Sequence, residues 1–200
     1  IYEIEKGSMC ELDKILQRYI MLPRRPQKYR HKSEEHNKAV RNMTNLINHD
    51  KPVLIVGEVG TGKSFLAEHI HCNGTDHDFT LEEISCADLD VEYGMELFLG
   101  VTRGFRAPIK QCRKGILSKA NDKGLIFLKD IHLLPLPLQE VLADVLEKRT
   151  FRKVGDDVVI PFTAHFIASC NDIDGIDPGK FNRKLYDILM HNVVRIPSLR

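Results

Sequence analysis

The chain has 200 residues, of which 42% are hydrophobic and 28% are charged, and its formal net charge is +1. These values are ordinary for a globular domain, and so small a net charge gives no bulk attraction to nucleic acid or to a membrane surface. No apolar run approaches the ~20 residues that cross a bilayer, so we expect no membrane partner. The five cysteines are scattered and odd in number, which favours free thiols and a cytoplasmic location over a disulfide framework.

Residues 1–32 precede the region in which strands and helices alternate, and they are interpreted as a separate N-terminal segment. A capping box followed by an apolar stripe predicts a helix over 8–21. Residues 22–32 contain five Lys/Arg and no acid, which is typical of a basic linker; a nucleic-acid or phosphate contact is the less favoured alternative. A helix over 33–48 is then expected to open the domain that we assign to 33–200.

From residue 51 onward, apolar strands alternate with helices, which predicts an α/β fold with a parallel sheet and helices on both faces. The predicted strands lie near 53–56, 79–85, 125–128, 163–169 and 193–196. The predicted helices lie near 63–72, 90–98, 115–121, 137–148 and 180–190. Residues 150–160 interrupt this alternation, and we expect an inserted β-hairpin there that turns at Gly155-Asp156.

Residues 57–64 read Gly-Glu-Val-Gly-Thr-Gly-Lys-Ser, a complete G-x-x-x-x-G-K-[ST] phosphate loop. The loop stands between a predicted strand and a predicted helix, where its backbone N–H groups and the helix N-terminus bind a polyphosphate. Lys63 is expected to contact the β- and γ-phosphates, and the Ser64 hydroxyl to hold Mg²⁺. The predicted nucleotide-binding residues are Gly57, Glu58, Val59, Gly60, Thr61, Gly62, Lys63, Ser64 and Phe65.

The order of the further motifs resembles the AAA+ ATPase domain of bacterial sigma-54-dependent transcriptional activators. The resemblance extends over roughly residues 33–200. It is carried by the phosphate loop at 57–64, by Ile84–Leu89, by Glu96-Leu97-Phe98, by a Walker B segment at Gly124–Asp130, by Leu134–Gln139, by the hairpin Phe151–Gly155, by a sensor I segment at Ala168–Asn171, and by Arg195–Arg200.

This resemblance implies an AAA+ P-loop NTPase core that binds ATP or ADP with Mg²⁺ in a bacterial cytoplasm. It also implies contact with a sigma factor, RNA polymerase or another protein, and self-association. In the family a helical lid follows the position of Arg200, so no lid is expected within these 200 residues. Contact with DNA is expected only through domains that this stretch of chain does not include.

Several residues depart from the family pattern at its working parts. Where the family has adjacent Asp and Glu in Walker B, this chain has Lys129 and Asp130. The ammonium of Lys129 cannot ligate Mg²⁺ and would repel it if it points into the site. It could instead neutralise phosphate charge directly. A further alternative is that Lys129 swings out to solvent and leaves the site. A one-residue shift would instead make Asp130 the metal aspartate. The candidate catalytic residues are therefore Asp130 and Asn171, and the candidate metal ligands are Ser64 and Asp130.

Three other features that the resemblance marks as functional have also changed. The two arginine fingers of the family fall at Asn182 and Ile188, with Arg183 one position away. Ser85 occupies the place of the asparagine that restrains the catalytic glutamate. The sigma-contacting signature G-A-F-T-G-A is replaced by Arg-Gly-Phe-Arg-Ala-Pro at 103–108.

We therefore expect an ATP-binding AAA+ domain with weak or no ATPase activity and an altered sigma contact. One alternative is an active ATPase that remodels a transcription complex, and another is a nucleotide-independent interaction module. A small-molecule P-loop kinase is disfavoured because the hairpin, the sensor segment and the run Arg-Ile-Pro-Ser-Leu-Arg at the end of the chain would have no role.

Overall fold

The computed structural model describes residues 34–47, 51–73, 81–102, 113–121, 124–177 and 179–198. The helix predicted over 8–21, the linker 22–32 and the sigma-contacting segment 103–108 lie outside these described residues. The elements in chain order are α2 (Glu34–Ile47), β1 (Val53–Val56), α3 (Lys63–Asn73), β2 (Leu81–Ser85), η1 (Cys86–Asp88), α4 (Val91–Leu99), β3 (Gly100–Val101), β4 (Arg113–Lys114), α5 (Ile116–Lys119), β5 (Leu125–Lys129), η2 (Ile131–Leu133), α6 (Leu136–Lys148), β6 (Thr150–Phe151), β7 (Ile160–Pro161), β8 (His165–Cys170), α7 (Arg183–Met190) and β9 (Val193–Arg195).

Five of these strands form one sheet in the order β2-β5-β8-β1-β9, and every neighbouring pair is parallel. The predicted α/β fold with a parallel sheet is thus confirmed. The strand β1 is buried along its whole length, as expected for a strand that is covered on both sides. Within the described ranges, no helix combines the length and the apolar content needed to cross a bilayer.

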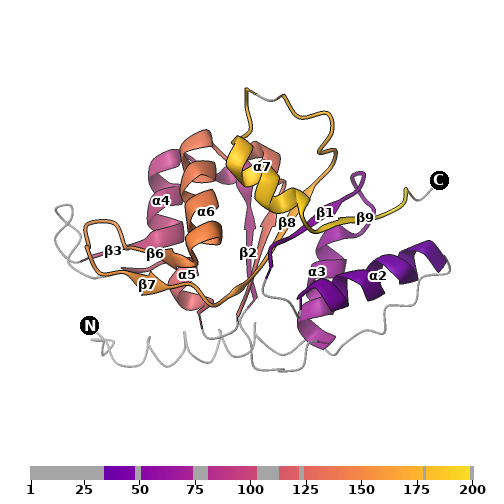
Figure 1. Ribbon diagram of the computed structural model, residues 1–200, viewed down its shortest axis with the longest axis horizontal. Coiled ribbons are helices and arrows are strands. Elements are labelled where there is room, and N and C mark those ends of the chain that lie inside the picture. The colour runs from indigo at the N-terminus through magenta and orange to yellow at the C-terminus, as the bar shows by residue number, and fades with distance from the viewer. Residues whose placement is uncertain are drawn as a thin grey trace, which may run out of the picture.

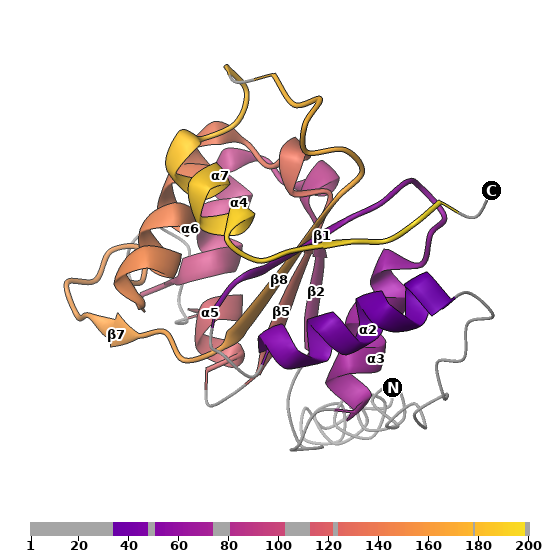
Figure 2. The same cartoon turned by 45° about the vertical axis from the view of Figure 1, so that its right-hand side comes forward.

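Helices cover both faces of this sheet, as Figures 1 and 2 show. The helices α2 and α3 lie on one face, and α4, α5, α6 and α7 lie on the other. Alternation along β1 divides its side chains between two cores. Leu54 and Val56 belong to the core that also contains α6 and α7 residues, whereas Val53 and Ile55 pack with Leu66 of α3.

The predicted hairpin is present, but its ladder is confined to its base. The strands β6 and β7 pair through only two residue pairs. Gly155 has φ = 79°, and the Asp156 N–H donates to the Lys153 carbonyl at 3.1 Å, so the chain turns where the sequence indicated. Val154 pairs instead with Val101 of β3, which belongs to a short antiparallel ribbon, β3–β4, that the sequence did not predict.

Candidate functional site

The phosphate loop joins the carboxyl end of β1 to the start of α3. Gly60 and Gly62 have φ = 86° and 87°, a left-handed conformation that glycine adopts without a steric penalty. Gly57 has a different role, because a Cβ atom there would lie 2.9 Å from the Thr61 hydroxyl and 3.2 Å from Cβ of Ile196. The glycines of the motif are therefore required by this backbone path.

Lys63 is held across the mouth of the loop. Its ammonium donates to the carbonyls of Gly57 and Glu58 at 2.7 and 3.0 Å and to Oδ1 of Asn171 at 2.8 Å. Partial burial lowers the pKa of Lys63, and the charge of Asp130 opposes this shift. The lysine therefore links the loop to the end of β8, where Asn171 lies.

A cavity of about 310 Å³ opens between the phosphate loop and the carboxyl ends of β5 and β8. It brings together most of the predicted site residues, and Lys129 and Ser169 join them. Its lining consists of Val59, Gly60, Gly62, Lys63, Ser64, Lys129, Asp130, Ser169 and Asn171.

Four residues of the predicted nucleotide-binding set do not line this cavity. Gly57 and Glu58 contribute the carbonyls that accept from Lys63. Thr61 is 5% exposed, and its hydroxyl donates to the Glu58 carbonyl at 2.8 Å, which stabilises the loop. Phe65 is 38% exposed, and its ring stacks with that of His69 on the surface of α3.

The alternation of strand residues explains why Lys129 and Ser169 reach the cavity. In β5, Leu125 and Phe127 belong to the core on the α3 side of the sheet, and Lys129 continues that series. In β8, Ile167 belongs to the same core, and Ser169 continues it. Because parallel strands end at one edge of a sheet, both side chains meet the phosphate loop there. Strand period and topology could have identified Ser169, but sequence motifs alone did not.

Asp130 lies where the chain leaves β5 in a left-handed turn, with φ = 53° and ψ = 54°. Aspartate tolerates this conformation better than most residues do. The Asp130 N–H donates to the hydroxyl of Ser169 at 3.2 Å, and Ser169 is only 2% exposed. This buried hydroxyl therefore fixes the backbone that presents Asp130 to the cavity.

Lys129 lines this cavity, and it has a charged partner that the sequence analysis did not identify. Its ammonium forms an ion pair with the carboxylate of Glu83 on the neighbouring strand β2. The Lys129 side chain is 36% exposed and that of Glu83 is 29% exposed. The pairing depends on the β2–β5 register, in which Glu83 lies opposite Phe127, on the same face of the sheet as Lys129.

The residues at this cavity fit the Mg²⁺ implied by the family only poorly. Ser64 and Asp130 both line it and offer oxygen atoms, the ligands that Mg²⁺ prefers. Lys129 lines the same cavity, and its positive charge disfavours a divalent cation there. In the part of the chain that the structure describes, no three His, Cys, Asp or Glu residues come together to hold a metal ion.

Two buried cysteines lie near this edge of the sheet and are free thiols. Burial raises the pKa of Cys86 to about 12 and that of Cys170 to about 11, so both thiols stay protonated at neutral pH. Cys170 donates to the Asp172 carbonyl at 3.2 Å. Both residues therefore act as packing groups in the core rather than as nucleophiles.

The start of α7 shows how the changed finger positions are used. Asn182 caps the helix, because its Oδ1 accepts the Leu185 N–H at 2.9 Å. Ile188 packs against the apolar core. The side chain of Arg183 is 87% exposed and pairs with Asp187 on the same helix. None of these three positions contacts the cavity described above.

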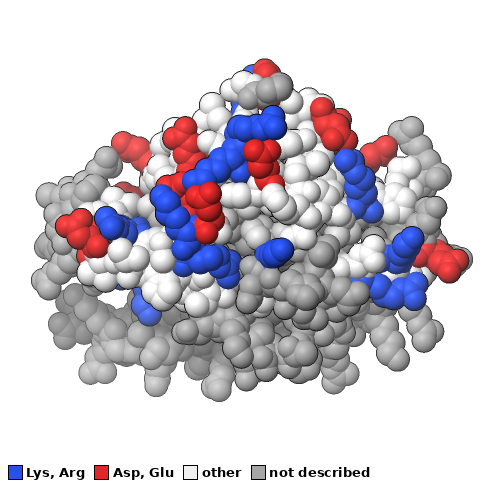
Figure 3. Space-filling model, in the orientation of Figure 1, with Lys and Arg blue, Asp and Glu red and all other residues white. Residues whose placement is uncertain are grey.

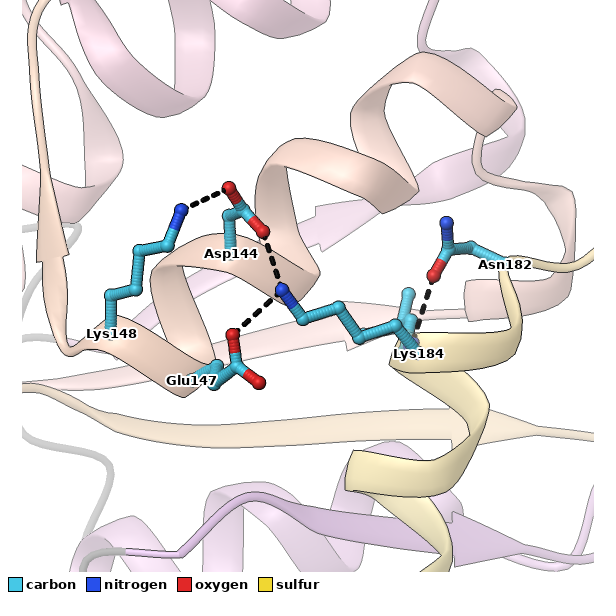
Figure 4. Close-up of polar contacts among 6 residues, drawn as sticks. Asp144, Glu147, Lys148, Asn182 and Lys184 are labelled. Carbon is cyan, nitrogen blue, oxygen red and sulfur yellow. Dashed lines mark hydrogen bonds and ion pairs between the residues drawn. The ribbon is translucent and has the colours of Figure 1, made fainter.

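Charged contacts tie α7 to α6, as Figure 4 shows. The ammonium of Lys184 extends from α7 and lies 2.7 Å from carboxylate oxygens of both Asp144 and Glu147. Lys148 also contacts Asp144, at 2.6 Å. On the face seen in Figure 3, basic and acidic side chains lie next to one another, so the described residues there form no extended patch of one sign.

A second cavity, of about 330 Å³, lies between α2 and β9. Its lining includes Lys38 and Asn42 from α2 and the segment 193–197. Ile196 belongs to that segment, and the Ile196 N–H donates to the Val56 carbonyl at 2.8 Å. The cavity therefore adjoins the start of the phosphate loop on the side away from Asp130.

Comparison with known proteins identifies relatives of this chain by sequence. The anaerobic nitric oxide reductase transcription regulator of Aliivibrio fischeri is 34% identical over 162 residues, which cover 80% of this chain and 31% of that protein. The nitrogen fixation protein AnfA of Azotobacter vinelandii is 31% identical over 150 residues, which cover 74% of this chain and 28% of that protein. The chain thus spans about a third of the length of these relatives.

Solved structures share the fold. The crystal structure of NtrX from Brucella abortus superposes with a TM-score of 0.76 at 20% identity, over 96% of this chain and 43% of that one. NtrX in complex with ATP gives a TM-score of 0.74 at 20% identity, over 96% of this chain and 41% of that one. The expected AAA+ α/β core is therefore confirmed. The family described as the sigma-54 interaction domain matches residues 29–196, and the chain belongs to it.

Proposed function

We propose that this chain is the nucleotide-binding domain of a transcription regulator, and that it binds ATP or ADP but hydrolyses ATP slowly or not at all. One observation carries the proposal: a single cavity joins Lys63 and Ser64 of the phosphate loop to Lys129, Asp130 and Asn171. NtrX, which has the same fold, has been solved with ADP and with ATP.

In this proposal, the loop N–H groups and Lys63 bind the phosphates, and Lys63 exchanges its carbonyl partners for phosphate oxygens. Asn171, which accepts from Lys63, keeps the ammonium at the mouth of the loop. The base and sugar are assigned to the cavity between α2 and β9, because that cavity adjoins the loop. The boundary between the segment 1–32 and the domain 33–200 remains a prediction.

Two features support the proposal of slow hydrolysis: the charged residues at the cavity and the changed finger positions. Phosphoryl transfer depends on positioning and on positive charge near the transferring phosphoryl group. Asp130 is the carboxylate available to orient water, but the adjacent Lys129 disfavours the metal that normally shares that task. The two finger positions of the family carry Asn182 and Ile188, so neither supplies the positive charge of an arginine. The alternative of an active ATPase draws its support from Asp130 and Asn171, which both line the cavity.

We further propose that the regulator is a bacterial cytoplasmic protein with an altered sigma-54 contact. The relatives described above are bacterial regulatory or nitrogen-fixation proteins, and the family is described by its interaction with sigma-54. The change of sequence at 103–108 motivates the altered contact. Because both finger positions have changed, we expect a monomer or a small oligomer, which light scattering in the presence of ATP would measure.

Replacement of Lys63 with alanine tests nucleotide binding. The change removes a charged donor to phosphate, so the free energy of ATP binding should weaken by about 1–3 kcal/mol. Isothermal titration calorimetry measures this difference, and circular dichroism shows whether the variant keeps the wild-type fold. Lys148→Ala is the matched control, because Lys148 is likewise a hydrogen-bonded lysine but lies outside the cavity. Equal ATP affinity of the wild type and the Lys63 variant would disprove the assignment.

A further inference from the structure

We propose that the ammonium of Lys129 takes the place of a divalent cation at the phosphates, so that this chain binds nucleotide without Mg²⁺. In the absence of nucleotide, the carboxylate of Glu83 holds this ammonium as its counter-ion. The proposal rests on the nucleotide binding proposed above and adds a metal-independent mode of binding and a residue that controls it.

The position of Lys129 in the cavity is the first observation that supports the proposal. Lys129 is the last residue of β5, and its side chain lines the same cavity as Lys63. A polyphosphate in this cavity therefore meets two ammonium groups, one from the phosphate loop and one from the sheet edge. Each ammonium offers three donors on a flexible stem, which suits it to phosphate oxygens as a movable point charge.

The ion pair between Lys129 and Glu83 is the second observation that supports the proposal. Glu83 lies on β2, the edge strand of the sheet, and the β2–β5 register places it on the same face as Lys129. Both side chains remain partly exposed, so the carboxylate can be hydrated once the ammonium leaves it. An exposed ion pair is weak, because water and salt screen it. The pair can therefore open when a phosphate, which carries a higher negative charge, enters the cavity.

Charge compensation also explains why the metal becomes dispensable. Mg²⁺ normally neutralises the oxygens of the β- and γ-phosphates. Lys129 supplies positive charge at the same cavity, and it competes with Mg²⁺ by like-charge repulsion. A purely structural Lys129–Glu83 pair that holds β2 to β5 would leave nucleotide affinity independent of Glu83, and this difference makes the proposal testable.

The experiment is calorimetric titration of ATP into the 200-residue chain, once in EDTA and once in excess Mg²⁺. The wild type should bind ATP at least as tightly in EDTA as in Mg²⁺. Lys129→Met should weaken ATP binding in EDTA about tenfold or more, the loss expected for a charged hydrogen bond. Lys129→Asp should reverse the preference, so that Mg²⁺ strengthens binding. Lys148→Met serves as the control and should leave both titrations unchanged.

Glu83→Gln provides a second test that leaves Lys129 intact. The amide keeps the size of the side chain but lacks the negative charge that attracts the ammonium, so ATP binding in EDTA should become several-fold tighter. Unchanged affinity of this variant would reduce the pair to a structural contact and overturn its proposed role. Wild-type binding that occurs in Mg²⁺ and is lost in EDTA would overturn metal independence and leave the proposed function standing. Absence of binding under both conditions would overturn the proposed function itself.

Discussion

Replacement of Gln139 with alanine should destabilise the fold, because this side chain connects α6 to the start of α7. Gln139 is fully buried. Its amide donates to the Leu134 carbonyl at 2.6 Å and to the Lys180 carbonyl at 3.3 Å, and its Oε1 accepts the Asn182 N–H at 2.7 Å. A single side chain thus satisfies backbone groups from two segments that are far apart in sequence.

The magnitude follows from the two shorter bonds. Each buried backbone group that loses its partner costs about 1–3 kcal/mol, and truncation of the side chain adds a small cavity. We therefore expect the free energy of unfolding to fall by about 2–6 kcal/mol, a large share of the ~5–15 kcal/mol that is typical of a domain. Gln139→Glu retains the acceptor for Asn182 but buries a charge and sets an oxygen against the Leu134 and Lys180 carbonyls, so its loss should be at least as large as that of the alanine variant.

Urea unfolding followed by circular dichroism measures these differences. Glu140→Ala is the matched control, because Glu140 is the next residue of α6 and is exposed. The reasoning would be refuted if Gln139→Ala and Glu140→Ala had unfolding free energies within about 0.5 kcal/mol of each other, the range of ordinary surface substitutions.

Two further predictions concern packing and charge. In Gly115→Ala the new Cβ would lie 2.3 Å from both the Gly100 nitrogen and the Phe98 carbonyl oxygen. The free energy of unfolding measured in the same urea assay should therefore fall by about 1–3 kcal/mol. A variant as stable as the wild type would contradict this close approach. Hydrogen bonds from Lys148 and Lys184 hold the pKa of Asp144 below its ordinary value of 3.8. These contacts therefore stabilise the fold at any pH above 3.8, and their contribution is lost as the pH falls through the lowered pKa. The stability difference between wild type and Asp144→Asn should therefore be present at neutral pH and disappear in strong acid; a difference independent of pH would contradict the assignment.

The sequence was sufficient for the features that have a local period or a fixed spacing. The strand 53–56 and the phosphate loop after it are examples, because burial on both faces produces a continuous apolar run and the loop requires glycines at fixed positions. The β3–β4 ribbon has two residues in each strand, which is too short for any alternation to be read.

The partners of site residues were less predictable, because they depend on register between distant strands. Glu83 meets Lys129 only because β2 pairs with β5 in one particular register. Ser169 supports Asp130 because β8 lies beside β5. Asn182 could be recognised as a changed finger position, but its use as a helix cap became clear only from the bond to Leu185. The spacing of the motifs thus predicted most of the residues that line the cavity, whereas the partners of Lys129 and Asp130 depend on the pairing of distant strands.

The measurement that tests the central claim most directly is steady-state phosphate release at an ATP concentration that calorimetry shows to be saturating for the same preparation. The account predicts that ATP binds and that turnover remains far below ~1 s⁻¹, since Lys129 lines the site that Mg²⁺ would share and the finger positions are changed. Turnover at the ~1–100 s⁻¹ typical of phosphoryl-transfer kinases would contradict the account.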